Sequence, residues 1–147
     1  MTDTHAPTSA LDQMLCFEIY STEHAFGRLY KDLLQPLGLT YPQFLVMILL
    51  WEQDGRSISG IGAALGLESN TLTPLVKRLE AAGFVTRSRD KQDERRVLVS
   101  LTETGDAMRH QVGHIRACVT KATGMTEQEL LDLFSNLRKL RKAVAAA

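Results

Sequence analysis

"SNTLTPLVKRLEAAGFVTRSRDKQDERRVLVSLT", residues 69–102, is a helical pattern followed at once by two strand patterns. Leucine and valine recur on one helical face up to Gly83, a residue type common at helix C-terminal caps. The segments 84–89 and 97–102 then have the composition of short strands, joined by the charged sequence DKQDERR. Because Ser57 can cap a small-residue helix, "ISGIGAALG", just upstream, the predicted order is helix, turn, helix, hairpin.

The second helix of this pattern is long enough to read a major groove, and its polar side chains lie opposite the leucines. Short polar groups near its start can reach base edges or phosphates, and two cations supply charge. The candidate DNA-contacting residues of the helix are Ser69, Asn70, Thr71, Thr73, Lys77 and Arg78. Pro74 should remove a hydrogen bond or bend the axis, unless the helix begins after Ser69. An ordinary amphipathic surface helix is the alternative interpretation.

The hairpin favours the DNA-binding interpretation, because an arginine on a basic wing can enter the minor groove. Net charge is zero, from 17 basic and 17 acidic residues, but the charge is unevenly distributed. Residues 1–67 carry 3 basic and 7 acidic side chains, residues 68–101 carry 7 and 5, and residues 102–147 carry 7 and 5. We therefore place a phosphate-binding surface in the middle segment, where the basic residues are Lys77, Arg78, Arg87, Arg89, Lys91, Arg95 and Arg96.

Further helices are predicted before and after the segment that contains the helix-turn-helix and the hairpin. An apolar stripe begins at Ser9, which has an acidic residue three positions on, and a nearly all-apolar buried helix follows the cap-like Thr40. After the hairpin, Thr102 can cap a helix that runs to a break near Gly124, and Thr126 begins the last helix with a capping box. Apolar stripes as long as these bury against each other or against a second copy of the chain.

These patterns predict a mainly α fold with a small β-hairpin wing. It is a winged helix-turn-helix whose N- and C-terminal helices form a dimerisation region. Residues 1–8 are polar and small and are expected to be a disordered leader, followed by a single domain at 9–147. Within that domain the expected segments are the dimerisation helices at 9–38 and 103–147, the DNA-binding module at 40–102 and its wing at about 84–101.

Length and composition exclude several classes of protein. A chain of 147 residues, 44% apolar and 23% charged, has room for one folded unit with a core. Its longest apolar run, FLVMILLW, is far shorter than the roughly 20 residues that cross a bilayer, and the N-terminus lacks the features of a signal peptide. We therefore expect a soluble cytoplasmic protein without a membrane partner. In a reducing cytoplasm its two widely separated cysteines are expected to be free thiols.

Cys16 shares a predicted helix face with two of the three tyrosines. At 100° per residue, Tyr20 lies about 40° to one side of Cys16 and Tyr30 about 40° to the other. Tyr30 is nevertheless about 21 Å from Cys16 along the helix axis, so it can contact Cys16 only if the helix is kinked or if the two residues belong to different chains. In the second case Tyr41, at the start of the next helix, can join Tyr30 at the thiol. Phenolic hydroxyls that donate to sulfur favour the thiolate, which attacks peroxides. A buried, unreactive cysteine with packing tyrosines is the plainer alternative.

The segment DERRVLVSLT, residues 93–102, resembles the D-x-R-x-x-x-x-x-L-T signature of MarR-type winged-helix repressors. By that resemblance Arg95 is the minor-groove residue and Asp93 orients it. Arg89, from the basic cluster of the hairpin, is a further candidate DNA-binding residue. "YSTEHAFGRLYKDLLQPLGLTYPQFLVMILLWE" and "LGLESNTLTPLVKRLEAAGFV", with the early cysteine, resemble the OhrR subfamily, whose members sense organic hydroperoxides. The resemblance implies a homodimer that reads a near-palindromic DNA operator, and no cofactor is expected.

The OhrR resemblance also implies roles for the thiols. Tyr20, Tyr30 and Tyr41 match the positions around the sensing cysteine, here Cys16, with Tyr30 and Tyr41 contributed across the dimer. In two-cysteine members a late cysteine, here Cys118, resolves the sulfenic acid as a disulfide between subunits. Cys118 also fits the apolar stripe of its own helix. The expected function is a repressor, not an enzyme, that releases its operator when an organic hydroperoxide oxidises Cys16.

Three alternative functions stay open at this point. His110, His114 and Cys118 lie four residues apart along a predicted helix and carry nitrogen and sulfur donors that zinc accepts. The preferred interpretation is that the protein has no metal site. A thiol peroxidase using Cys16 is disfavoured because nothing nearby recycles the cysteine. The third alternative is a repressor that responds to a small phenolic ligand, as other MarR-type repressors do. Only the thiol chemistry distinguishes it from a peroxide-sensing repressor.

Overall fold

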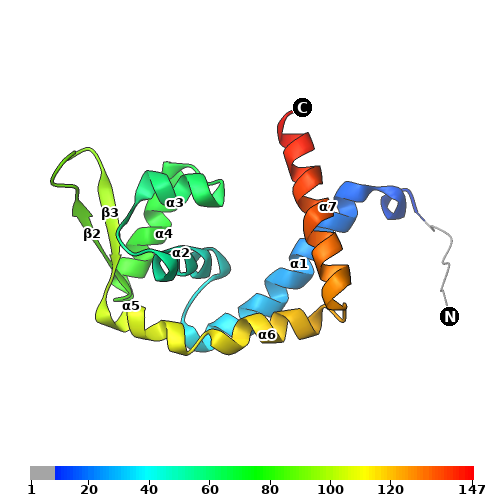
Figure 1. Cartoon of the computed structure of the whole chain (residues 1–147), viewed down its shortest axis with the longest axis horizontal. Coiled ribbons are helices and arrows are strands. Elements are labelled where there is room, and N and C mark those ends of the chain that lie inside the picture. Colours follow the sequence, from blue (N-terminus) through cyan, green and yellow to red (C-terminus); the bar gives the residue numbers. More distant parts are fainter. Residues whose placement is uncertain (1–8) are drawn as a thin grey trace. The chain divides into compact units, whose positions relative to one another are not determined.

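The computed structural model describes residues 9–147, and the expected leader at residues 1–8 lies outside them. The chain forms two compact units, Met1–Arg109 and His110–Ala147. Helices dominate both units, and the first contains a small antiparallel sheet (Figure 1). The mainly α fold class with a hairpin wing is thus confirmed.

Helix α1 (Leu15–Leu34) begins later than the sequence indicates. Only a 3-10 turn, η1 (Leu11–Gln13), follows Ser9, and the Leu11 N–H donates to the Ser9 hydroxyl at 3.0 Å. Met14 is then extended, with φ −95° and ψ 114°, so the α-helix starts afresh at the next residue. The predicted start at Ser9 is wrong, and the later start places Cys16 in the first turn of α1.

The next two helices begin at the caps that the sequence predicts. Thr40 forms a capping box with Gln43 at the start of α2 (Tyr41–Glu52). The Ser57 hydroxyl accepts a backbone N–H at 3.0 Å at the start of α3 (Ile58–Leu65). Local side-chain chemistry therefore sets both helix starts.

Helix α4 (Ser69–Ala81) is the second helix of the helix-turn-helix. It follows a turn at Gly66, whose φ of 68° lies in the left-handed region that glycine adopts without strain. Its apolar face packs against α2, α3 and the sheet, which leaves its polar face outward. Fully buried side chains of this core are Leu34, Val46, Met47, Leu50, Ile61, Leu72, Val76, Leu79, Val85 and Val99.

The sheet contains the wing and one strand that the sequence does not predict. Its antiparallel order is β1 (Arg56–Ser57), β3 (Val97–Leu101) and β2 (Val85–Arg89). The β2–β3 hairpin confirms the expected wing, with Val85 opposite Leu101 and Arg89 opposite Val97. Strand β1 has only two residues, too few to show an alternating pattern.

Close backbone contacts fix the base of the wing. Thr102 caps α5 (Glu103–Ala107) as predicted, and its hydroxyl donates to a backbone carbonyl just after α4 at 2.6 Å. Gly105 lies so close to Phe84 that an added Cβ would be 2.0 Å from the Phe84 carbonyl oxygen. The Gly105 carbonyl accepts the Trp51 indole N–H at 2.9 Å. The wing is therefore tied to α2 and to the end of α4.

The second unit contains α6 (Gly113–Ala122) and α7 (Glu127–Ala145). Thr126 forms a capping box with Glu129 at the start of α7, as the sequence predicts. A short local motif is thus sufficient to predict where the last helix begins.

The single helix predicted between Thr102 and Gly124 is wrong. After α5 the chain passes through a 3-10 turn, η3 (Met108–His110), before α6 begins. β-Branched Val112 and Gly113 lie at this break and have low helix propensity, which explains why the helix does not continue.

Within residues 9–147, no single helix is long and apolar enough to cross a membrane. Only the bent pair Leu15–Leu37 and Tyr41–Glu52, with 66° between its members, meets the length and composition of a broken span. Five side chains of α2 are buried in the first unit.

Candidate DNA interface and thiol site

Helix α4 presents its predicted DNA-reading face to solvent. The candidate residues on this face are exposed except for a half-buried Thr73, and they are Ser69, Asn70, Thr71, Thr73, Lys77 and Arg78. No side chain caps α4, and the Thr71 N–H donates to the Glu68 carbonyl at 3.1 Å, so the N–H groups of Ser69 and Asn70 are the ones open to phosphate oxygens. In the part of the chain that the structure describes, neither Lys77 nor Arg78 forms an ion pair.

Pro74 lies in the interior of α4, because the helix begins at Ser69 and not later. The proline has no N–H, so it donates nothing to the Asn70 carbonyl four residues earlier. The helix continues past it, and Leu75 is buried directly afterwards. Packing of the apolar face therefore outweighs the local cost of the proline.

Arg87 has a structural role and is not a free cation of the wing. Its guanidinium donates to Glu80 Oε1 from Nε at 3.2 Å and from Nη2 at 3.1 Å, and its backbone N–H donates to Glu80 Oε2 at 3.0 Å. The backbone bond and then the side-chain bonds hold the pKa of Glu80 below its ordinary value of 4.5. This clamp joins the C-terminal part of α4 to β2.

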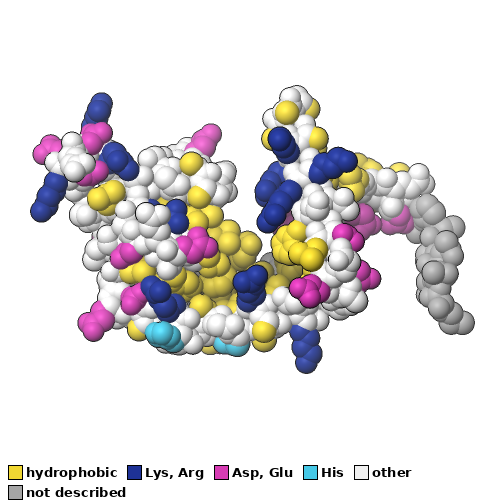
Figure 2. Space-filling view, viewed as in Figure 1, with side chains coloured by type: hydrophobic (Ala, Val, Ile, Leu, Met, Phe, Trp, Pro, Cys, Tyr) yellow, Lys and Arg dark blue, Asp and Glu magenta, His cyan; other side chains and the backbone are white. Residues whose placement is uncertain are grey.

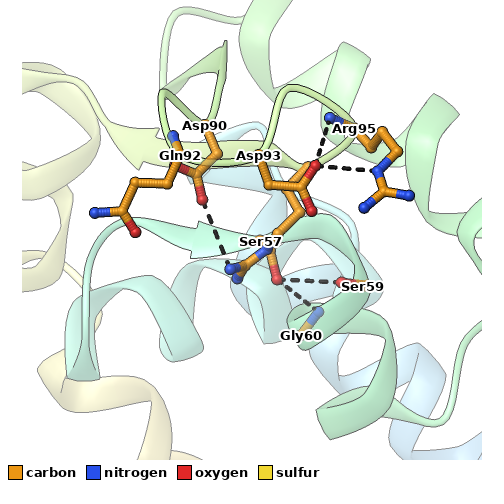
Figure 3. A network of polar contacts seen from close by, with 8 residues as sticks. Ser57, Ser59, Gly60, Asp90, Gln92, Asp93 and Arg95 are labelled. Carbon is orange, nitrogen blue, oxygen red and sulfur yellow. Dashed lines mark hydrogen bonds and ion pairs between the residues drawn. The ribbon is translucent and has the colours of Figure 1, made fainter.

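The wing loop holds Arg95 on a neighbouring carboxylate. Asp93 Oδ1 accepts the backbone N–H of Arg95 at 3.1 Å and its side-chain Nε at 3.2 Å (Figure 3). The side-chain bond, followed by the backbone bond, lowers the pKa of Asp93. The Arg95 side chain is still 92% exposed. Its guanidinium is thus oriented at Nε while its terminal nitrogens extend into solvent.

Two further arginines stabilise the same loop. Arg89 Nη1 donates to the Glu94 carbonyl at 2.7 Å, and Arg96 Nη1 lies 3.6 Å from Asp90 Oδ2. Figure 2 shows Lys and Arg side chains beside acidic ones around this hairpin. Within the hairpin loop, Arg89 and Arg96 therefore hold the loop together, whereas Arg95 extends outward.

Cys16 is exposed in the first turn of α1, directly after Leu15. From the sequence it is expected two turns into a helix beginning at Ser9, which is wrong because the 3-10 turn and Met14 interrupt that helix. Because α1 begins at Leu15, the thiol lies in the first turn, where the positive end of the helix dipole is.

The three tyrosines occupy two separate places. Tyr20 lies one turn from Cys16 on α1 and is 56% exposed. Tyr30 and Tyr41 meet where α1 packs on α2, with ring centroids 4.6 Å apart. Burial raises the pKa of both hydroxyls, and Tyr41 raises the pKa of Tyr30 further, so both remain protonated donors. Among the described residues, no hydrogen bond joins any of these hydroxyls to the Cys16 sulfur.

Both terminal segments expose apolar surface. Around the start of α1, side chains that are 38% to 61% exposed are Leu11, Met14, Leu15, Ile19, Tyr20 and Phe26. On α7, those that are 40% to 66% exposed are Leu131, Leu133, Phe134, Leu137 and Val144. Large apolar side chains exposed in such numbers are typical of surfaces that contact another protein.

Cys118 is exposed on α6, in the second unit. His114 lies on the same helix, but His110 belongs to the 3-10 turn η3, so the three zinc-ligand candidates do not follow one helical face. Within residues 9–147, no group of three or more His, Cys, Asp or Glu side chains could hold a metal ion. The helical spacing that suggested a zinc site is therefore interrupted between His110 and His114.

Two supporting positions were not singled out from the sequence. Glu80 pairs with Arg87 across the turn between α4 and β2, a separation that no helix or strand rule connects. Trp51 reaches Gly105 through a contact between distant segments, and its only signal is that it is the sole tryptophan. Both contacts depend on tertiary structure.

A helix-turn-helix followed by a two-stranded basic wing defines a winged-helix DNA-binding protein. The family model described as "Transcriptional regulator SarA/Rot" matches residues 28–112, more than half of the chain. The chain therefore belongs to the SarA/Rot family of transcriptional regulators, whose winged helix is of the MarR type.

Individual relatives cover nearly the whole chain. The HTH-type transcriptional regulator TtmR of Methylorubrum extorquens is 47% identical over 93% of this chain and 70% of its own length. The organic hydroperoxide resistance transcriptional regulator of Bacillus subtilis is 38% identical over 88% of both. Reduced AbfR bound to DNA is 34% identical over 92% of this chain and 94% of its own, with a TM-score of 0.79. Disulfide-formed AbfR is 35% identical over 86% and 88%, with a TM-score of 0.64.

Proposed function

We propose that this protein is a homodimeric cytoplasmic repressor that binds its operator while Cys16 is reduced and leaves it when an organic hydroperoxide oxidises that thiol. The observation that carries the proposal is the exposed thiol in the first turn of α1, with Tyr20 on the next turn. Leu15 and Ile19, 61% and 43% exposed, flank it. Apolar surroundings favour a peroxide with an organic group over hydrogen peroxide.

In this proposal each subunit reads half of the operator. The polar face of α4 enters the major groove, and Arg95, oriented by Asp93, enters the minor groove. Arg89 stabilises the wing loop and adds positive charge near the phosphates.

The dimer forms through the segments 9–38 and 103–147, which carry the exposed apolar surfaces of α1 and α7. An antiparallel approach of the two α1 helices would bring the Tyr30–Tyr41 pair of one subunit to Cys16 of the partner subunit. Half-sites about 34–36 Å apart make operator binding sensitive to small movements at this interface.

The oxidation balances without a cofactor. The Cys16 thiolate attacks the distal oxygen of the hydroperoxide, the O–O bond breaks, and the alkoxide takes a proton to leave as an alcohol. Sulfur is oxidised to the sulfenic acid and the peroxide is reduced. Cys118 of the other subunit then attacks the sulfenic acid, so that a disulfide forms and water leaves. The thiol is consumed in one cycle, so the protein acts as a switch and not as an enzyme.

Two relatives support this proposal. The Bacillus subtilis protein is named for organic hydroperoxide resistance, and AbfR has been solved both reduced on DNA and in a disulfide-formed state.

The test is an operator gel shift titrated with cumene hydroperoxide. The wild type should release DNA, Cys16→Ser should remain bound, and reductant should restore binding to the oxidised wild type. Cys118→Ser is the matched control, because it should still form the sulfenic acid but no covalent dimer on a non-reducing gel. Release of Cys16→Ser at the wild-type peroxide concentration would refute the thiol switch. Rapid reduction of many equivalents of peroxide per Cys16 in the presence of an added thiol reductant would indicate a peroxidase.

A further inference from the structure

The wing loop between β2 and β3 is closed by the residues at its two ends, Asp90 and Arg96. The Asp90 backbone N–H donates to the Arg96 carbonyl at 2.9 Å, directly after the last β2–β3 pair. The Arg96 N–H donates to the Asp93 carbonyl at 2.9 Å, which makes a hydrogen-bonded turn from Asp93 to Arg96. Arg95 is the third residue of that turn, so its backbone position depends on where Arg96 is held.

The Asp90 side chain links the two ends of the loop. Its Oδ1 accepts the Gln92 backbone N–H at 2.9 Å, and its Oδ2 lies 3.6 Å from Arg96 Nη1. The Asp90 side chain is only 16% exposed, whereas that of Arg96 is 52% exposed. Figure 3 shows Asp90 with Gln92 and Asp93 with Arg95 along the same loop. One acidic side chain therefore joins the turn that begins the loop to the arginine that ends it.

We propose that Asp90 is a positioning residue for DNA binding: its ion pair with Arg96 holds the wing turn in the conformation that presents Arg95 to the minor groove. The inference deepens the proposed function and rests on its placement of Arg95. A loop that is ordered before binding loses less conformational freedom on the DNA, so holding the turn increases the affinity.

The negative charge of Asp90, taken alone, has the opposite effect. A carboxylate on a DNA-binding surface repels phosphates, so neutralising it would strengthen binding if Asp90 acted only through its charge. Positioning predicts weaker binding instead. Asp90→Asn separates the two, because asparagine loses the ion pair but keeps a side-chain oxygen for the Gln92 N–H.

Glu94 offers a matched control in the same loop. It is exposed, and its side chain makes no hydrogen bond or ion pair within residues 9–147. Glu94→Gln therefore changes the charge of the wing by the same amount as Asp90→Asn without breaking a contact.

The experiment measures fluorescence anisotropy of a labelled duplex, enriched from random sequence by the wild type, with reduced full-length protein well below its Tm. Asp90→Asn should weaken binding roughly three- to tenfold, the size of one polar interaction lost from an ordered loop. Glu94→Gln should bind as tightly as the wild type or more tightly. In an Arg95→Ala background, Asp90→Asn should cause no further weakening, because the side chain that it positions is gone.

An Asp90→Asn protein that binds as tightly as the wild type, or more tightly, would overturn the proposal. So would an equal loss in Glu94→Gln, or the full loss in the Arg95→Ala background, since Asp90 would then act without Arg95. If Arg95→Ala itself binds like the wild type, the proposed placement of Arg95 fails and this role falls with it. Release of the wild type by peroxide tests the thiol switch separately.

Discussion

Replacing Gly105 by alanine tests whether the wing depends on the close contact at its base. The added Cβ would lie 2.0 Å from the Phe84 carbonyl oxygen, 2.9 Å from its carbonyl carbon and 3.2 Å from its Cα, all backbone atoms. The backbone must therefore move. That movement strains the bond from the Thr102 N–H to the Phe84 carbonyl, 3.1 Å, and the Trp51 indole bond to Gly105, 2.9 Å.

Overpacking of this kind costs about 1–3 kcal/mol, and one weakened hydrogen bond adds about 1 kcal/mol. A loss of about 3 kcal/mol lowers Tm by roughly 6–12 °C in a protein of this size. Thermal unfolding followed by circular dichroism measures the shift, and operator affinity should fall with it. Gly113→Ala is the control, because no atom lies within 4 Å of its added Cβ, and it should change the free energy of unfolding by less than about 1 kcal/mol. A Gly105→Ala protein that melts within about 2 °C of the wild type would refute the reasoning.

Three further predictions concern α4 and the wing. Pro74→Ala restores a helix N–H and should raise the free energy of unfolding by about 1–2 kcal/mol in urea titrations, and a decrease would mean that the proline ring packs favourably. The pKa of Glu80 is lowered by Arg87, so the stabilisation from this clamp is present above pH 4.5 and is lost as pH falls through the lowered pKa. At acid pH the free energy of unfolding should therefore fall more steeply with decreasing pH in the wild type than in Glu80→Gln. Equal slopes for the two proteins would contradict a stabilising role of the clamp. Arg95→Ala should weaken operator binding by about 1–3 kcal/mol in fluorescence anisotropy without changing Tm, and unchanged affinity would remove Arg95 from the interface.

The sequence by itself was sufficient for the starts of four helices and for the β2–β3 hairpin. Thr40, Ser57, Thr102 and Thr126 each begin a helix where their capping motifs predict one. The apolar stripe of α4 and the charged loop of the hairpin are likewise local patterns. Caps, stripes and turns depend on neighbours within a few residues, which is why a linear reading finds them.

Other features were decided only by the tertiary structure. The break at Met14 moves Cys16 to the first turn of α1, and the interruption before α6 separates His110 from the helix that carries His114 and Cys118. The pairing of Arg87 with Glu80 shows which cation of the basic cluster is already occupied.

The sensing region shows the same division most clearly. The spacing of Cys16, Tyr20 and Tyr30 already indicates that one straight helix cannot bring all three together. Only the packing of α1 on α2 shows that Tyr30 meets Tyr41. The physical reason is range: a sequence records which residues can share a face, whereas ring contacts depend on how separate elements and their side chains pack.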